Sequence, residues 1–256
     1  MNFTVSYLPE IAFIFMLIFG RLGTMIMIMP ALGETSVPTR MRLVMALAIT
    51  LVFYPVVVSF YPAGLSDNIY RVLAMLGAEI VIGAFIGLAT RLITSVLQIA
   101  GTIIANQSGL AFAMAFDPSQ GVQGALFGNF LSVVGITLIF VTDMHFLAIA
   151  AMHDSFELFP PGNWVPIGDA AELIMNTVAG VFSIGMRMAA PFIVFGLIFY
   201  FGLGLLNRLM PQMQIFFIAM PANIIIGLLM LMILLSTLMT WYLGHVEDAF
   251  GQFLVR

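Results

Sequence analysis

Long hydrophobic runs separated by short polar stretches dominate the chain. Each of six runs is close to or above the roughly 20 apolar residues that an α-helix needs to cross a membrane. The runs cover residues 11–32, 43–61, 72–104, 125–142, 170–207 and 215–243. Several of the links between them are rich in Gly, Pro, Asn and Asp, which are typical turn residues. The pattern predicts an all-α membrane protein with about six long hydrophobic helices.

The stretch between the third and fourth runs has a different pattern. In residues 106–124, large side chains alternate with alanines and end at Asp117-Pro118. A period of two is typical of an extended segment, and Pro118 disfavours helical backbone at Asp117. The large side chains are those of Leu110, Phe112, Met114 and Phe116. We predict a non-helical loop, which either blocks an aqueous passage or packs as a re-entrant loop, because irregular backbone at membrane depth needs a cavity or protein around it.

A few charged side chains interrupt the apolar runs: Arg21, Glu79, Arg91 and Arg187. A charge at the centre of a bilayer costs about 2.5–3.5 kcal/mol on insertion scales, so such side chains are expected to face protein or a watery cavity. They form either a proton or ion path, or pairs between helices or subunits that fix their register. A path normally uses several carboxylates along one route, and among these side chains Glu79 is the one carboxylate. We therefore favour pairing.

Composition supports an apolar environment for most of the chain. Of the 256 residues, 62% are hydrophobic and 8% are charged, with a mean hydropathy of +1.14. A typical soluble domain is about 45–50% apolar and about 25% charged. All eight basic residues are arginines and the net charge is −4, which argues against nucleic-acid binding. The absence of cysteine excludes disulfides, thiol catalysis and cysteine metal sites.

The polar connection over residues 143–169 contains the most reactive side chain types. Asp143, His145, His153 and Asp154 all lie in it. The two histidines are eight residues apart, which differs from the i,i+4 spacing of a helical zinc pair. The chain also has no hydrolase elbow, Walker A loop or dinucleotide fingerprint. We therefore predict no catalytic residue, no cofactor site and no metal site.

Two glycine pairs have the spacing that lets helices approach closely. Gly83 and Gly87 form one pair, and Gly124 and Gly128 form the other. This small-xxx-small pattern predicts close helix packing, either within the chain or with a neighbouring chain.

Several short motifs follow one another in the order typical of a known family. They are Arg21-x-Gly23, Met29-Pro-Ala-Leu-Gly33, Val37-Pro38-x-Arg-x-Arg42, Gln107-x-Gly109, Phe116-Asp-Pro118, Phe140-x-x-Asp-x-His145, and Pro211 to Pro221 followed by Gly227. Together they resemble the FliR family of flagellar biosynthetic export-gate proteins, over nearly the whole chain. One departure is Met144, which stands where the family usually has Gly in an Asp-Gly-His pattern.

The resemblance implies a fold and a plugging segment. Residues 1–165 would form a part similar to the P gate protein, including loop 106–124. Residues 166–256 would form a helical hairpin similar to the Q gate protein, with its tip at 207–214. In the family the loop between the third and fourth helices plugs the closed pore. The corresponding residues here are Gly109, Leu110, Phe112, Met114 and Phe116, and the hairpin tip carries Arg208 and Pro211.

The resemblance also implies a cellular role. The chain would be a non-enzymatic subunit of the flagellar type III export gate in the bacterial inner membrane, at the flagellar basal body. Its partners would be the P and Q gate subunits, the B export-switch protein and the exported flagellar polypeptides. No cofactor is implied, and no nucleic acid. Because no nucleotide site is present, the energy for transport would come from elsewhere.

Three alternatives remain open from the sequence. A small-solute or ion transporter would use Glu79, Arg91 and Arg187. An intramembrane enzyme would depend on Asp143, His145 or His153. A virulence-type secretion gate would share the architecture of the flagellar gate.

Overall fold

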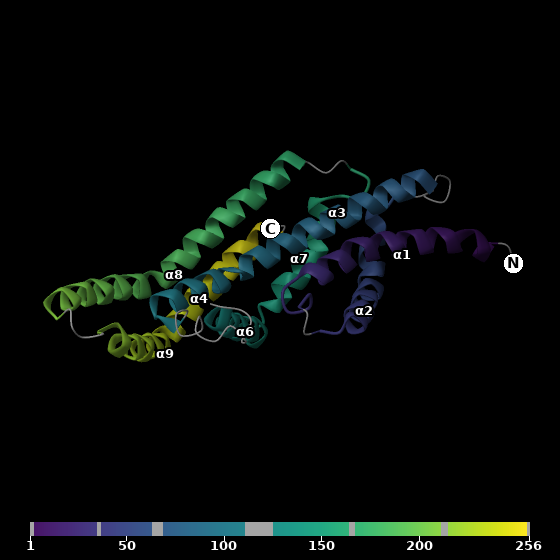
Figure 1. Cartoon of the computed structure of the whole chain (residues 1–256). Coiled ribbons are helices and arrows are strands. Elements are labelled where there is room, and N and C mark those ends of the chain that lie inside the picture. Colours follow the sequence, from purple (N-terminus) through teal and green to yellow (C-terminus); the bar gives the residue numbers. More distant parts are fainter. Residues whose placement is uncertain are drawn as a thin grey trace. The chain divides into compact units, whose positions relative to one another are not determined.

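The computed structural model is built of helices, and residues 3–34, 37–62, 69–110, 125–163, 167–210 and 215–254 are described and contain no strand (Figure 1). Five helices are long and apolar enough to cross a membrane, or six if the bent pair α6 and α7 counts as one span. The predicted all-α class with about six long apolar helices is thus confirmed for the described part of the chain. The helices are α1 (Phe3–Ile28), α2 (Thr39–Val57), α3 (Ile69–Thr94), α4 (Val96–Gln107), α6 (Ala125–Val141), α7 (His145–Leu158), α8 (Ile167–Leu209) and α9 (Ile215–Phe250), with 3-10 turns η1 (Val58–Phe60) and η4 (Gly251–Phe253).

The connection predicted over residues 143–169 contains a helix that the sequence analysis missed. Helix α7 has 14 residues, and its buried side chains recur at helical spacing. They are Ala151, Met152, Ser155 and Phe156. The histidines and acidic residues between them hid this apolar stripe, which is too short for a membrane span but long enough to bury one face against protein.

A sharp bend separates α6 from α7. The two helix axes meet at 77°. Asp143 lies at the bend with a φ of 61°, in the left-handed region that non-glycine residues rarely enter and that Asp tolerates better than most. The bend ends the fourth apolar run where the sequence predicted its end.

Two other boundaries differ from the prediction. The third run is interrupted at Ser95, where α3 gives way to α4. Helix α8 continues to Leu209, so Asn207 and Arg208 are helical and do not begin the hairpin turn. Pro211, at the predicted tip, lies outside the described residues.

The predicted loop after the third run is described only at its start. Asn106 and Gln107 still belong to α4, so the helix extends two residues further than predicted. Ser108 and Gly109 form a turn, and Leu110 has helical backbone. Phe112, Met114 and Phe116 lie outside the described residues, so the extended conformation predicted for them stays a prediction.

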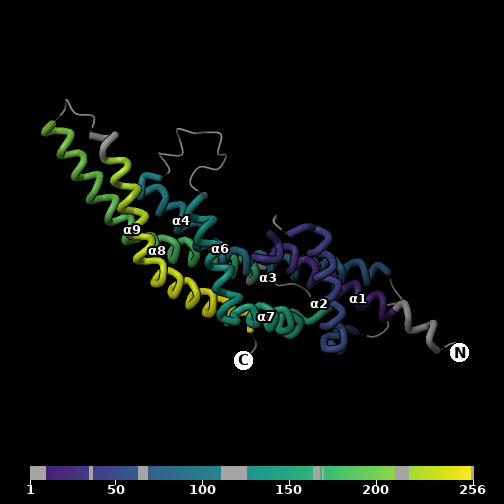
Figure 2. Tube along the Cα trace, turned by 90° about the horizontal axis from the view of Figure 1, so that it is seen from below, coloured from purple at the N-terminus to yellow at the C-terminus, as the bar shows by residue number. Residues whose placement is uncertain are grey.

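The chain packs as two compact units. Residues 1–93, 142–177 and 247–256 form unit 1, and residues 94–141 and 178–246 form unit 2. In unit 1, α1 packs against α2. In unit 2, α4 and α6 lie side by side (Figure 2). The division into a P-like part and a Q-like hairpin at residue 165, which follows from resemblance, stays a prediction.

Candidate functional site

A buried arginine is the most highly connected polar side chain of unit 1. Arg21, on α1, is 0% exposed, and its Nε donates a hydrogen bond to the carboxylate of Glu79 on α3. Its Nη1 donates to the carbonyl oxygen of Ser155 at 2.7 Å, and its Nη2 to that of Phe159 at 2.9 Å. The guanidinium also lies 4.3 Å from the ring centroid of Phe156. Arg21 and Glu79 therefore pair with each other, while Arg21 also holds the end of α7.

The position of Arg21 follows from the chemistry of a helix end. The carbonyls at the end of a helix carry partial negative charge, so a cation there stabilises them. Arg21 supplies that cation to the C-terminus of α7 from a different helix. All three guanidinium nitrogens are occupied, and the network contains a single carboxylate. This arrangement fits a structural clamp between α1, α3 and α7 better than a relay of protons.

Tyr61 lies beside this clamp, just after η1. Its ring packs edge-on against Phe156, with 6.4 Å between ring centroids. The phenol of a tyrosine is uncharged at neutral pH, so Tyr61 adds packing but no charge to the cluster.

Glycines on α3 allow α1 to approach the clamp. A Cβ at Gly83 would lie 2.0 Å from Thr24 Oγ1 and 2.3 Å from the carbonyl oxygen of Arg21. A Cβ at Gly87 would lie 3.0 Å from the Cβ of Ile28. Glu79, Gly83 and Gly87 recur every four residues and so share one face of α3. The Gly83–Gly87 pair is therefore used for packing within this chain.

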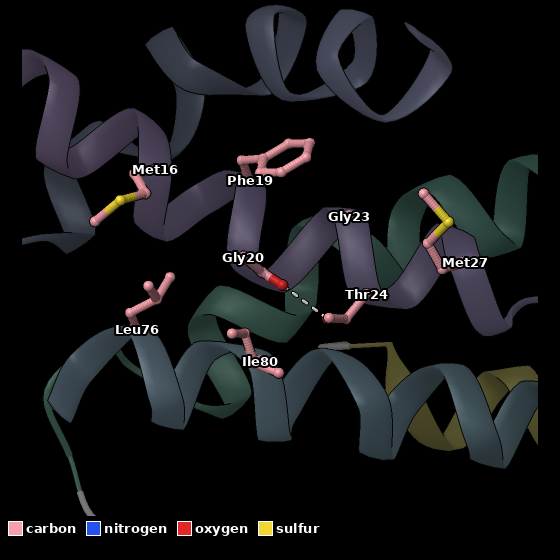
Figure 3. Close-up of a pocket in the computed structure, with 8 residues that line it drawn as sticks. All are labelled: Met16, Phe19, Gly20, Gly23, Thr24, Met27, Leu76 and Ile80. Atoms are coloured by element: carbon pink, nitrogen blue, oxygen red, sulfur yellow. Dashed lines mark hydrogen bonds between the residues drawn. The ribbon is translucent and has the colours of Figure 1, made fainter. Parts of the chain in front are cut away.

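An apolar groove of about 370 Å³ lies between α1 and α3, on a face that Gly20 and Gly23 leave open (Figure 3). The hydroxyl of Thr24 is turned into the helix, where it donates to the carbonyl oxygen of Gly20 at 2.7 Å. The lining consists of Met16, Phe19, Gly20, Gly23, Thr24, Met27, Leu76 and Ile80. With no ionisable group in its wall, the groove offers apolar surface and no catalytic chemistry.

The other charged residues singled out in the sequence lie on the surface of the chain. Arg91, Arg187 and Arg208 are all exposed. Glu79, which the transporter hypothesis would combine with Arg91 and Arg187, is instead engaged by Arg21. Each of the three exposed arginines lies within or at the end of an apolar helix.

The histidines of α7 make local contacts. His153 Nδ1 lies 2.9 Å from Asp154 Oδ1, in a partly exposed pair. The ring of His145 lies 4.3 Å from that of Phe146, measured between centroids. Among the described residues, no three His, Asp or Glu side chains come together in a way that could hold a metal ion.

The start of the predicted plug, Gly109 and Leu110, directly follows the end of α4 in unit 2. Gly109 has a φ of +71°, and the buried Ser108 before it donates its backbone N–H to the carbonyl oxygen of Ile104 at 2.9 Å. Asn223 on α9, which the sequence analysis did not single out, donates to the carbonyl oxygen of Gln107 at 3.2 Å. A signal for Asn223 was present in the sequence, because it is an amide inside an otherwise apolar run.

Comparison with known proteins identifies the group to which the chain belongs. The profile of the family described as "Bacterial export proteins, family 1" matches residues 12–249. A protein named flagellar biosynthetic protein FliR from Caulobacter vibrioides is 41% identical over 88% of this chain and 90% of its own length. The FliR of Pectobacterium carotovorum is 32% identical over 85% of this chain and 82% of its own length. The Yop proteins translocation protein T of Yersinia pestis is 27% identical over 67% of this chain and 66% of its own length. The chain therefore belongs to family 1 of the bacterial export proteins.

Proposed function

We propose that this chain is a multi-pass subunit of a flagellar type III export gate, and that residues 109–116 plug the closed secretion pore. The observation that carries the proposal is the family match over nearly the whole chain, with full-length flagellar relatives. The gate would lie in the bacterial inner membrane at the flagellar basal body. It would pass flagellar polypeptides in complex with P and Q subunits and the B protein, and it would do so without catalysis.

Uncovered apolar surface supports a role inside a larger assembly. In the most apolar 18-residue window of each helix, only 17% of the residues of α8 and 22% of those of α9 are buried by this chain. Arg187 is exposed on α8, and a charge in contact with hydrocarbon costs about 2.5–3.5 kcal/mol. A neighbouring subunit that covers α8 and offers a carboxylate or carbonyl oxygens would remove that cost. Lipid alone would not.

The bulky residues of the proposed plug can account for a mostly closed pore. Leu110, Phe112, Met114 and Phe116 would exclude water and ions until a substrate polypeptide enters. Moving one large apolar side chain into water costs about 1.5–3 kcal/mol. Four such side chains together would exceed the roughly 5.5 kcal/mol that separates a 1:99 from a 99:1 equilibrium.

Two loop variants test the plug in the assembled gate. The first deletes residues 109–116, and the second changes Leu110, Phe112, Met114 and Phe116 to Ser. We expect both complexes to assemble and to conduct small ions when reconstituted in vesicles, because the apolar seal is gone. The matched control changes Ala111, Ala113 and Ala115 to Ser, which keeps the large side chains and should stay sealed. Ion permeability that is equal in all three complexes would contradict the plug.

The similarity to a Yersinia pestis protein bears on the alternative of a virulence-type secretion gate. The relative from Yersinia pestis shows that the family extends to proteins named for Yop translocation, although its identity to this chain is lower than that of the Caulobacter relative. Restoration of swimming in a bacterium that lacks its own FliR would support the flagellar assignment. Restored Yop secretion without restored swimming would favour the virulence system.

A further inference from the structure

We propose that Asn223 is a positioning residue that fastens the last turn of α4 and so fixes the point from which the plug segment starts. The residues that make this contact, Asn223, Gln107 and Tyr200, all lie in unit 2. Its consequence for sealing rests on the proposed plug function of residues 109–116.

Asn223 acts as a cap supplied from another helix. Its side chain belongs to α9, is 2% exposed, and donates Nδ2–H to the carbonyl oxygen of Gln107 at 3.2 Å. Gln107 is the last residue of α4, where the carbonyls point beyond the helix and can accept from a side chain of another element. The same Nδ2 lies 3.5 Å from the hydroxyl oxygen of Tyr200 on α8. Asn223 thus joins the end of α4 to both long helices of unit 2.

Glycines bring α8 and α9 close enough for this contact. A Cβ at Gly227, one turn after Asn223, would lie 2.3 Å from the Cβ of Ser108. A Cβ at Gly196 on α8 would lie 2.2 Å from Gln107 Oε1. Larger residues at these two positions would push the long helices away from α4. The last turn of α4 is therefore held from two sides.

The direction in which the chain leaves α4 depends on the same amide. Gly109 adopts a φ of +71°, and a Cβ there would lie 2.8 Å from Asn223 Nδ2. Both the left-handed backbone and the close approach to the Asn223 amide favour glycine at this position. Because the turn at Gly109 is folded directly against Asn223, loss of the amide frees this turn.

Loss of Asn223 should loosen the turn without dismantling the unit. Helix α4 is also packed on α6, where a Cβ at Gly101 would lie 2.4 Å from the Cα of Gly128. That contact lies more than one turn from Gln107 and does not involve Asn223. The predicted defect is therefore a local one, in the anchoring of the plug.

The first test compares Asn223→Leu with Asn106→Leu in the assembled gate. Asn106 lies in the same turn of α4, but its side chain is exposed. In Asn223→Leu we expect hydrogen exchange of the amides of residues 106–110 to be at least about tenfold faster, because the partly buried carbonyl of Gln107 loses the Asn223 amide as its donor. Ion leak through the gate should rise in this variant and stay at the wild-type level in Asn106→Leu.

The second test restores the contact by a covalent bond. The Cβ built at Gly109 lies 3.8 Å from the Cβ of Asn223, which is the usual separation in a disulfide. The chain has no cysteine of its own, so Gly109→Cys with Asn223→Cys gives one defined pair. On oxidation the two thiols lose two electrons and two protons to an added oxidant such as diamide, and the disulfide forms. The oxidised gate should be sealed and the reduced gate should leak, whereas each single cysteine variant should leak equally in both states.

The outcomes separate this inference from the plug itself. If deletion of residues 109–116 causes leak but Asn223→Leu neither leaks nor exchanges faster, the fastening role of Asn223 is refuted and the plug stands. If exchange is faster in Asn223→Leu but neither variant leaks, the plug is refuted, and with it the role of Asn223 in sealing. Failure of the cysteine pair to cross-link would overturn the contact on which the inference is built.

Discussion

Removing Arg21 alone should be among the most damaging single substitutions in unit 1. In Arg21→Met the Glu79 carboxylate remains buried without its cation, and the carbonyl oxygens of Ser155 and Phe159 each lose the guanidinium as a donor, although Ser155 keeps the backbone N–H of Phe159. Breaking a buried ion pair by removing one partner costs about 3–5 kcal/mol. Native domains are stable by only about 5–15 kcal/mol, so this loss is a large share of the total.

The double variant separates pairing from simple loss of packing. Glu79→Met alone should cost less than Arg21→Met, because the guanidinium keeps its two carbonyl partners. In Arg21→Met with Glu79→Met, no charge is left buried, and replacing both members of a buried pair by apolar residues is often close to neutral. We therefore expect the double variant to be more stable than the sum of the single losses implies, with a coupling energy of about 2 kcal/mol or more.

The assay is equilibrium unfolding of the purified chain in detergent, with the four proteins compared in one double-mutant cycle. The loss of unfolding free energy in the double variant is compared with the sum of the losses in the two single variants. Agreement within about 0.5 kcal/mol would refute the coupling between Arg21 and Glu79, because substitutions at independent sites are additive to that extent. Protein export measured in cells gives a second reading of the same variants. Export by the double variant would exclude Glu79 as an essential proton carrier, whereas a stable assembled gate without export would support that role.

Two further predictions concern glycine packing and an exposed charge. Gly83→Ala should destabilise the chain by about 1–3 kcal/mol, because its Cβ would lie 2.3 Å from the backbone oxygen of Arg21. Gly77→Ala in the same helix meets nothing within 4 Å and should stabilise by about 0.5–1 kcal/mol, so equal thermal midpoints for the two variants would contradict this packing. Arg187→Leu should leave the thermal midpoint of the isolated chain unchanged but lower the yield of P and Q subunits that co-purify with it. Undiminished co-purification would show that no partner uses this charge.

Features that repeat along the chain were predictable from the sequence. The long helices follow from apolar runs of spanning length, and the spacing of Gly83 and Gly87 predicted a close helix contact on that face of α3, although not that α1 makes it. Helix α7 was missed because its apolar stripe is short and is interrupted by histidines and acidic residues. Length and mean hydropathy, the properties that reveal a span, do not reveal a helix that buries only one face.

Features that depend on long-range contact were not predictable. The sequence indicated that the charge of Arg21 needs a partner, but Glu79 is 58 residues away and Phe159 is 138 residues away. Asn223 looks like an interruption of an apolar run until the carbonyl of Gln107, 116 residues earlier, is placed beside it. One-dimensional patterns report which side chains need a partner, and the fold determines which partner each receives.

The clamp around Arg21 also constrains how the chain can be made. Glu79 follows Arg21 by 58 residues, but the carbonyl of Ser155 follows it by 134. At a translation rate of about 5–20 residues per second, Arg21 waits roughly 7–27 s after its own synthesis for α7 to reach it. Glu79 is made first, so between its synthesis and that of α7 the guanidinium has its carboxylate but not its carbonyl partners. The nascent chain therefore depends on its insertase, or on helices that are already present, to shield this charge until α7 is made.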